Sequence, residues 1–259
     1  DLVIADTGAD TVEAPGAPNC YCCPPSVTRT VASSAAWAYS VSGKAVWANL
    51  YGSNSFESEV PGAGRVKLAQ ETDYPWDGRI RFTLQSAGDF ALNLRIPAWA
   101  EGATIRVNGQ AGPAAQAGKY AAISRAWKAS DTVELSLPIE ARLVEAHPKA
   151  EELRNQVAVM RGPVLYALES PDLAPGVRIS EIAIPLKIQL KPRHDAHLLK
   201  GVTVLEGQAL RIPEGDWSGT LYRTVKKTVP EKVNLRLIPY YAWDNRGLPH
   251  MTVWMPLLR

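Results

Sequence analysis

Hydrophobic and polar residues alternate with a period of two along most of the chain. In RIRFTLQS, Ile80, Phe82 and Leu84 share one face, and DFALNLRIPAW and DTVELSLP repeat the pattern. This alternation predicts half-buried β-strands. The dipeptide Asn108-Gly109 follows one such run and predicts a tight hairpin turn. Further strands are predicted at AVWANLYGS, QVAVMRGPVLYAL, VTVLEG, KVNLRLIPYYAW and MTVWMP.

One segment near the start of the chain has helical spacing instead. Val27, Val31 and Ala35 recur at intervals of four residues, which places them on one face of a helix. Pro24 and Pro25 come just before them, and proline suits the first turn of a helix because its missing N–H costs little there. The segment therefore predicts one helix of about four turns.

The order of these elements predicts an all-β fold that follows a single helix. Turn-forming residues are frequent, with 20 Pro and 19 Gly, and they punctuate the strands at intervals typical of sandwiches. The polar stretch HPKAEELRN, residues 147–155, separates two strand-rich blocks. We therefore expect two antiparallel β-sandwich domains.

Composition and charge limit the partners. The 259 residues carry 28 basic and 26 acidic side chains, a net charge of +2, so no basic surplus indicates nucleic acid or an anionic membrane as partner. No apolar run approaches the roughly 20 residues of a spanning helix. The first residue is Asp1 rather than Met, so the lack of a targeting segment carries no information and the localisation stays open.

The three cysteines lie within four positions, at Cys20, Cys22 and Cys23. They are too few for a disulfide scaffold. Thiolates are the reactive and metal-binding form of cysteine, and the start of a helix just downstream favours that form. A zinc ion shared by Cys22 and Cys23 would need two more ligands. The alternative is that all three are small buried thiols.

An acidic and aromatic run, QETDYPWDG, is a second candidate site. Glu71, Asp73 and Asp77 suggest paired carboxylates for acid–base chemistry. Tyr74 and Trp76 could stack on the face of a sugar. The interpretation that we favour is a loop that packs its aromatic residues beneath a sandwich.

The histidines form the third candidate. His194 and His197 are three residues apart and could share a helical face. A proline interrupts the segment, so we expect surface histidines without a ligand role. His147 and His250 are isolated and predicted to be structural.

Several segments together resemble the C-terminal part of the DUF1680 proteins, glycoside hydrolase family 127 of the β-L-arabinofuranosidase type. They follow the family's order over nearly the whole chain: CYCCPPSVTRTVASSAAWAYS, VWANLYGS, QETDYPWDG, LNLRIPAWAEGATIRVNGQ, YAAISRAWKASDTVELSLP, VAVMRGPVLYALE and LIPYYAWDNRGLPHMTVWMP. Each segment alone is a modest match, and the ordered set is specific.

The resemblance implies an (α/α)6 barrel that carries the active site, followed by β-sandwich domains. Residues 1–38 then correspond to the last helix of an otherwise missing barrel, with its Cys-Cys zinc and nucleophile segment. Residues 39–143 correspond to the first sandwich and residues 144–259 to the second. This division agrees with the helix and the strands predicted above.

The resemblance also implies a zinc-dependent glycosidase that retains anomeric configuration. The resemblance implies that Cys22 is the nucleophile and a zinc ligand and that Cys23 is a second zinc ligand. Cys20 does not match the family's third zinc ligand and is assigned no role. The remaining ligands and the acid–base glutamate would lie upstream of Asp1, so these residues alone are expected to be inactive. The implied substrate is an L-arabinofuranoside or a related pectic oligosaccharide, and no substrate-binding residue is assigned.

Two other functions stay open at this point. One is a non-catalytic β-sandwich module that binds carbohydrate or serves as a scaffold. Trp99, Trp127 and Trp254 suit sandwich cores, yet carbohydrate modules use such residues as binding platforms. The other is a structural zinc site without catalysis.

Overall fold

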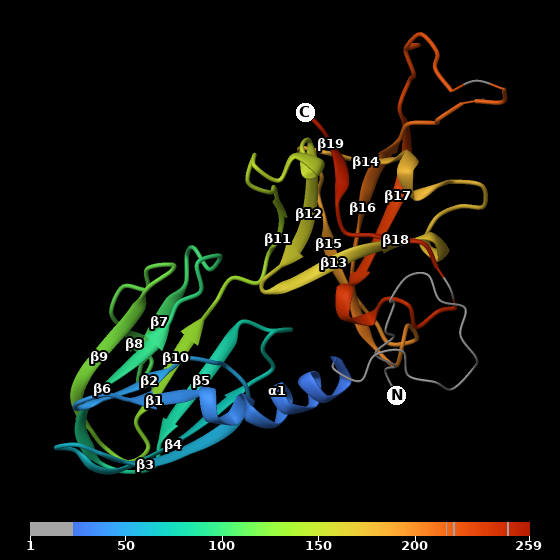
Figure 1. Cartoon of the computed structure of the whole chain (residues 1–259). Coiled ribbons are helices and arrows are strands. Elements are labelled where there is room, and N and C mark those ends of the chain that lie inside the picture. The colour runs from blue at the N-terminus through green and yellow to red at the C-terminus, as the bar shows by residue number, and fades with distance from the viewer. Residues whose placement is uncertain (1–22, 216, 220, 248) are drawn as a thin grey trace. The chain divides into compact units, whose positions relative to one another are not determined.

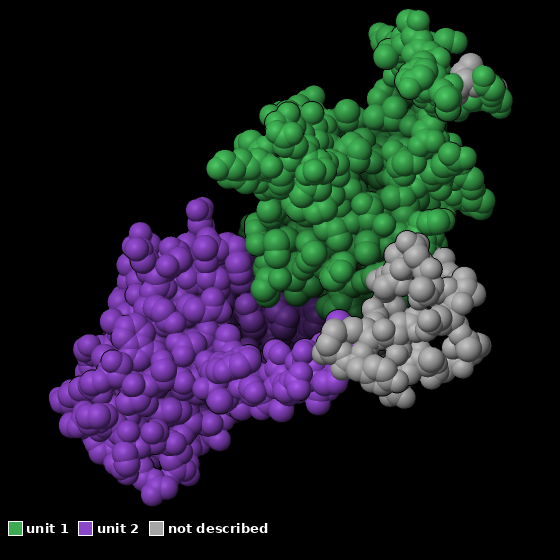
Figure 2. Space-filling view, viewed as in Figure 1, with its two compact units in different colours: residues 1–4, 140–259 green, residues 5–139 purple. Residues whose placement is uncertain are grey.

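The computed structural model of the protein describes residues 23–215, 217–219, 221–247 and 249–259. The described chain divides into two compact units after Ile139: the part before this division belongs to unit 2, and Glu140–Arg259 belongs to unit 1 (Figures 1 and 2). Both are built from strands, and the described residues contain one α-helix. The predicted all-β fold is therefore confirmed. No helix in the described ranges is both long and apolar enough to cross a membrane.

The helix predicted near the start of the chain is α1 (Cys23–Trp37). Pro24 and Pro25 occupy its first turn, where a proline displaces no helical hydrogen bond. None of its residues is buried, and Val27 and Val31 are 41% and 68% exposed. The apolar positions of α1 therefore add little to the core of unit 2.

Unit 2 is a sandwich of two sheets. Its strands are β1 (Tyr39–Val41), β2 (Ala45–Ala48), β3 (Asn54–Val60), β4 (Gly64–Thr72), β5 (Arg79–Leu84), β6 (Gly88–Arg95), β7 (Thr104–Val107), β8 (Gln110–Ala111), β9 (Tyr120–Trp127) and β10 (Thr132–Ser136). The four-stranded sheet has the order β1-β2-β6-β9, with β2 and β6 parallel, and the six-stranded sheet has the order β3-β4-β5-β10-β7-β8. Buried side chains from both sheets form one core between them.

The predicted alternation supplies that core. In β5, Ile80, Phe82 and Leu84 are fully buried, and the residues between them point to the other face. Burying each such side chain contributes roughly 1.5–3 kcal/mol. The outward positions are consequently free to carry polar and charged groups.

The three tryptophans assigned to cores differ in burial. Trp127 is 2% exposed, and its indole N–H donates to the carbonyl oxygen of Phe90 at 3.0 Å. This bond satisfies the one polar group that the ring buries. Trp99 and Trp254 are half-buried.

The predicted Asn-Gly turn joins β7 and β8. Asn108 and Gly109 both have positive φ, 50° and 77°, as a type I′ turn requires. The Asn108 amide donates to Asp131 and accepts from the backbone N–H of Thr132, both at 2.8 Å. The N–H of Lys128 donates to Asp131 at 2.9 Å. These bonds, first from Lys128 and then from Asn108, hold the pKa of Asp131 below its usual value.

Unit 1 contains the remaining elements. Its strands are β11 (Ala141–Val144), β12 (Gln156–Arg161), β13 (Val164–Glu169), β14 (Ile182–Pro185), β15 (Lys191–Asp195), β16 (Val202–Arg211), β17 (Glu231–Pro239), β18 (Met251–Thr252) and β19 (Met255–Leu258). Its short 3₁₀ helices are η1 (Glu151–Leu153), η2 (Ser170–Asp172), η3 (Ile179–Glu181) and η4 (Tyr240–Ala242). All strand pairs are antiparallel except β14 with β19.

The strands of unit 1 pair in a closed ring. The path runs β12-β19-β14-β16-β17-β13, and β13 pairs again with β12. Closure leaves fewer unpaired edges within the ring, and unpaired edges invite aggregation. Fully buried aliphatic residues and Tyr166 fill the interior. The strands of unit 1 therefore form one continuous sheet that closes on itself.

The division between the units falls after Ile139, slightly before the predicted division between residues 143 and 144. The reason is β11, which pairs with β12 and places Leu143 opposite Val159. A strand belongs to the unit that supplies its hydrogen-bonding partner, so β11 is part of unit 1.

Replacing Asp131 by Asn is expected to remove an acid-sensitive part of the stability of unit 2. The folded-state pKa of Asp131 is lowered, so its contribution is present above the unfolded value of about 3.9 and is lost as the pH falls through the folded pKa. Urea denaturation from pH 7 to pH 2 should show a smaller loss of stability in Asp131→Asn than in wild type. The exposed Asp89→Asn is the control and should follow wild type, and parallel curves for all three proteins would contradict the assignment.

Candidate functional site

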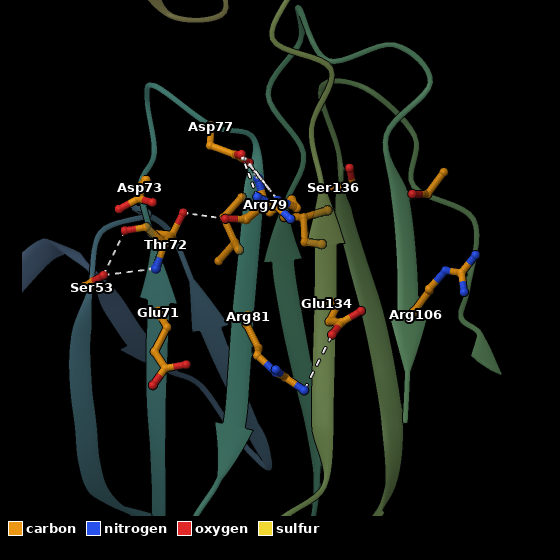
Figure 3. Close-up of a pocket in the computed structure, with 13 residues that line it drawn as sticks. Ser53, Glu71, Thr72, Asp73, Asp77, Arg79, Arg81, Arg106, Glu134 and Ser136 are labelled. Atoms are coloured by element: carbon orange, nitrogen blue, oxygen red, sulfur yellow. Dashed lines mark hydrogen bonds and ion pairs between the residues drawn. The ribbon is translucent and has the colours of Figure 1, made fainter. Parts of the chain in front are cut away.

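A cavity of about 680 Å³ opens on the outer face of the six-stranded sheet of unit 2 (Figure 3). Its lining residues come from β4, β5, β7, β10 and the adjoining loops: Ser53, Glu71, Thr72, Asp73, Asp77, Arg79, Ile80, Arg81, Thr104, Arg106, Glu134, Leu135 and Ser136. The volume lies in the range of small-molecule sites, about 300–1,000 Å³. Seven of its thirteen lining residues carry a charged side chain.

The strand register builds the floor of the cavity. Glu71 of β4 lies opposite Arg81 of β5, Arg81 lies opposite Glu134 of β10, and Glu134 lies opposite Arg106 of β7. Figure 3 shows these four side chains in one row across the strands. The nearest atoms of Arg81 and Glu134 are 3.6 Å apart. We call these four residues the charged row.

The loop between β4 and β5 forms one wall. The Asp77 carboxylate accepts hydrogen bonds from the backbone N–H of Arg79 at 2.7 Å and from its guanidinium at 3.1 Å. The bond to Asp77 raises the pKa of the Arg79 guanidinium. The Thr72 hydroxyl donates to the carbonyl oxygen of Arg79 at 2.6 Å and accepts from the N–H of Tyr74 at 3.0 Å. The loop is therefore held at both ends by its own polar groups.

The acidic and aromatic run from the sequence lies at this cavity. Glu71, Asp73 and Asp77 all line it. Tyr74 packs edge-to-face against Tyr51 with ring centroids 5.9 Å apart, as expected for a loop aromatic that supports the core. Sequence reasoning missed the three arginines of the cavity. The available signal was an arginine at two of the three outward positions of β5, where Arg79 and Arg81 flank the buried Ile80.

The cysteine candidates lie at the edge of the described chain. Cys23 is the first residue of α1 and is exposed, whereas Cys20 and Cys22 lie outside the described residues. The partial positive charge at a helix N-terminus favours a thiolate at Cys23. Thiolates suit zinc, but the described residues include no group of three or more His, Cys, Asp or Glu placed to hold a metal ion. Cys22 and Cys23 together would supply two of the four ligands that a zinc ion needs.

The histidine candidates do not share a helical face. His194 lies in the strand β15, His197 lies in the turn that follows, and both are exposed. His147 accepts a hydrogen bond at Nδ1 from the N–H of Lys149, 3.1 Å away. His250 donates through its backbone N–H to the hydroxyl of Ser170 at 3.1 Å. The first contact is local, the second joins segments far apart in the chain, and both are structural.

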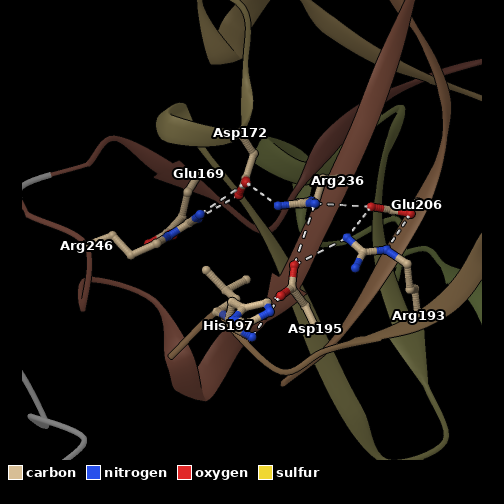
Figure 4. Close-up of polar contacts among 9 residues, drawn as sticks. Glu169, Asp172, Arg193, Asp195, His197, Glu206, Arg236 and Arg246 are labelled. Carbon is tan, nitrogen blue, oxygen red and sulfur yellow. Dashed lines mark hydrogen bonds and ion pairs between the residues drawn. The ribbon is translucent and has the colours of Figure 1, made fainter. Parts of the chain in front are cut away.

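A buried ion network in unit 1 was not foreseen from the sequence (Figure 4). Glu169 is fully buried and the side chain of Asp172 is 4% exposed. Arg246 bridges them, with its Nε donating to Glu169 at 2.8 Å and its Nη1 donating to Asp172 at 3.1 Å. Burial lowers the pKa of Arg246, but hydrogen bonds to Asp172 and Glu169 outweigh burial and hold the pKa above its usual value.

The network continues across the sheet toward solvent. Arg236 of β17 contacts Asp172 at 3.9 Å and Glu206 at 3.3 Å. Arg193 of β15 contacts the same Glu206 at 2.8 Å and Asp195 at 3.3 Å. Because these groups are paired with one another, we assign the network to holding the structure of unit 1 rather than to chemistry.

Two domain models of one protein family match the chain. The model described as "Beta-L-arabinofuranosidase, GH127 middle domain" matches residues 45–139. The model described as "Glycoside hydrolase family 127 C-terminal domain" matches residues 141–256. The two matches meet close to the division between unit 2 and unit 1.

Similar proteins agree with these models. A non-reducing end beta-L-arabinofuranosidase of Bifidobacterium longum subsp. longum is 31% identical over 91% of the chain and 37% of its own length. A solved glycoside hydrolase is 42% identical with a TM-score of 0.86, over 99% of this chain and 43% of that one. The crystal structure of a GH127 beta-L-arabinofuranosidase from Geobacillus stearothermophilus T6 is 38% identical with a TM-score of 0.83, over 92% and 38%. The chain spans less than half the length of each of these relatives.

Replacing Arg246 by Met is expected to lower the free energy of unfolding of unit 1 by about 3–5 kcal/mol, because two buried carboxylates lose their shared partner. The control Arg154→Met breaks an exposed pair with Glu151 and should cost about 1 kcal/mol or less. Urea denaturation at pH 7 measures both. Adding Glu169→Gln and Asp172→Asn to Arg246→Met should recover part of the loss. Equal effects of the two arginine substitutions would show that the network is energetically unimportant.

Proposed function

Because the chain belongs to glycoside hydrolase family 127, we propose that it forms the C-terminal part of a retaining β-L-arabinofuranosidase whose nucleophile is Cys22. The observation that carries the proposal is the ordered match of the two family domains, which begins shortly after the Cys22-Cys23 pair. The relatives named above support the same class of enzyme.

The reaction begins with a thiolate at Cys22. Its sulfur attacks the anomeric carbon of an L-arabinofuranoside, an S–C bond forms, and the bond from that carbon to the leaving oxygen breaks. A carboxylic acid that the family resemblance places upstream of residue 1 protonates the leaving oxygen. Water, deprotonated by the same carboxylate, then displaces the sulfur and restores the thiolate. Two displacements at one carbon retain its configuration.

The metal belongs to the same proposal. Zinc, held by Cys22 and Cys23 together with ligands from upstream, would keep both thiols deprotonated at neutral pH. Cys23 supports this role through its place at the first residue of α1, where the helix favours negative charge. Pro24 and Pro25 follow Cys23 in the first turn of α1, so the backbone next to the thiol is restricted.

The two sandwich units have a supporting role in this proposal. Their cores are separate and well filled, and neither contains a cluster of metal-binding side chains among the described residues. We assign them to a supporting role in the complete enzyme rather than to bond breaking.

Replacing Cys22 by Ser tests the nucleophile in the enzyme that includes the upstream segment present in the longer relatives. Hydrolysis of an aryl β-L-arabinofuranoside should fall by about a thousandfold or more, as expected when a nucleophile is lost. Cys20→Ser is the matched control and should keep wild-type activity. Turnover retained in Cys22→Ser would assign the nucleophile to another residue.

Bound zinc, measured by elemental analysis, provides a separate readout of the metal site. Cys23→Ser should lower the zinc content per chain, because one of four ligands is lost. Cys20→Ser should leave the zinc content unchanged. A wild-type preparation that is fully active without zinc would overturn the metal assignment and leave the nucleophile to be judged from Cys22→Ser alone.

A further inference from the structure

The charged row alternates between groups that accept and groups that donate hydrogen bonds. Carboxylates only accept and guanidinium groups only donate at neutral pH. Glu71, Arg81, Glu134 and Arg106 come from adjacent strands, so an acceptor and a donor follow one another at intervals of about 4.8 Å. A ligand that lies across the strands and matches this row needs groups that can both donate and accept.

The two ends of the row keep unused hydrogen-bonding capacity. Arg81 and Glu134 form an ion pair in the middle. Within the described part of the chain, neither Glu71 nor Arg106 has an ion-pair partner. The only hydrogen bond of the Arg106 guanidinium there is a long one, 3.4 Å, to the carbonyl oxygen of Gly109. The two end groups can therefore bind a ligand without breaking an existing ion pair.

Charge balance narrows the class of ligand. The cavity contains four carboxylates and three guanidinium groups: Glu71, Asp73, Asp77, Glu134, Arg79, Arg81 and Arg106. An anion would be repelled by the carboxylates and a cation by the guanidinium groups. An uncharged ligand with many hydroxyl groups can bind both the carboxylates and the guanidinium groups, since each hydroxyl donates one hydrogen bond and accepts others.

The loop that forms one wall of the cavity is preformed. The Asp77–Arg79 contact and the Thr72 hydroxyl hold the loop between β4 and β5 in one conformation. A preformed wall reduces the entropy lost on binding. The sheet beneath the cavity holds the charged row at the spacing of its strands. The backbone that carries these side chains is therefore in place before a ligand binds.

We propose that this cavity is a non-catalytic binding site for an uncharged oligosaccharide, with Glu71 and Arg106 as its two end contacts. Hydroxyl groups of successive sugar units would donate to the carboxylates and accept from the guanidinium groups along the row. The cavity volume of about 680 Å³ suits a short oligosaccharide better than a single hydroxyl compound. This site does not depend on the hydrolytic function proposed above.

The test is calorimetric titration of the protein, in a Cys22→Ser background so that no probe is consumed. The probes are arabinotriose and xylotriose as neutral sugars, trigalacturonate as an anion and spermine as a cation. We expect a neutral trisaccharide to bind with an affinity that hardly changes between 50 and 500 mM NaCl, since an uncharged ligand is not screened. Arg106→Ala and Glu71→Gln should each raise its Kd by about tenfold or more, because each removes hydrogen bonds from a charged group.

Lys67→Ala is the matched control. Lys67 lies on β4 and on the same face as Glu71, but outside the cavity, so its loss should leave the Kd unchanged. Urea denaturation confirms that each variant is folded. The proposal is overturned if neither neutral sugar binds, if trigalacturonate or spermine binds more tightly than both, or if binding persists in Arg106→Ala and Glu71→Gln. In the last case the sugar binds elsewhere, and the hydrolase proposal is untouched.

Discussion

Strand register is the constraint on which the rest of unit 2 depends. In β5 the buried Ile80, Phe82 and Leu84 alternate with outward residues, so a slip of one residue would expose all three and bury Arg79 and Arg81. The loss of apolar burial, together with the cost of burying two guanidinium groups, excludes that slip. The register that protects the core therefore also sets the order of charges on the outer face.

Unit 1 depends on a different constraint. Its strands close into a ring, and buried charges tie the loop that carries Arg246 to the end of one strand of that ring, β13. Arg246 lies in the loop after η4, while Glu169 ends β13 and Asp172 lies in η2. A buried ion pair adds little net stability but is costly to break. The network therefore acts mainly to fix one conformation of this loop against β13.

The proposed chemistry and the proposed binding site have different structural origins. The thiols at the start of α1 depend on local features, a helix terminus and a pair of prolines, which act on neighbouring residues. The cavity depends on four strands that are distant in sequence, since Glu71 and Glu134 belong to β4 and β10. A change in the sheet would alter the cavity while leaving the helix terminus intact, so the two proposals can succeed or fail separately.

The amino-acid sequence alone predicted what depends on neighbouring residues. Period-two alternation indicated β5 and its buried face, Asn108-Gly109 indicated the hairpin, and the spacing of Val27 and Val31 indicated α1, because each of these signals reflects backbone geometry over a few residues. The roles of Cys22 and Cys23 came from the resemblance to a family. No contact among the described residues tests them.

Only the tertiary structure decided which distant groups meet. The sequence placed Glu71 in an acidic run but gave no indication that Arg81, Glu134 and Arg106 lie beside it, because strand order is set by packing across the whole sheet. It likewise gave no sign that Arg246 reaches Glu169, far upstream in the chain. Pairing between remote charges depends on how sheets close and which faces they bury, and periodicity along one strand carries no information about its neighbours.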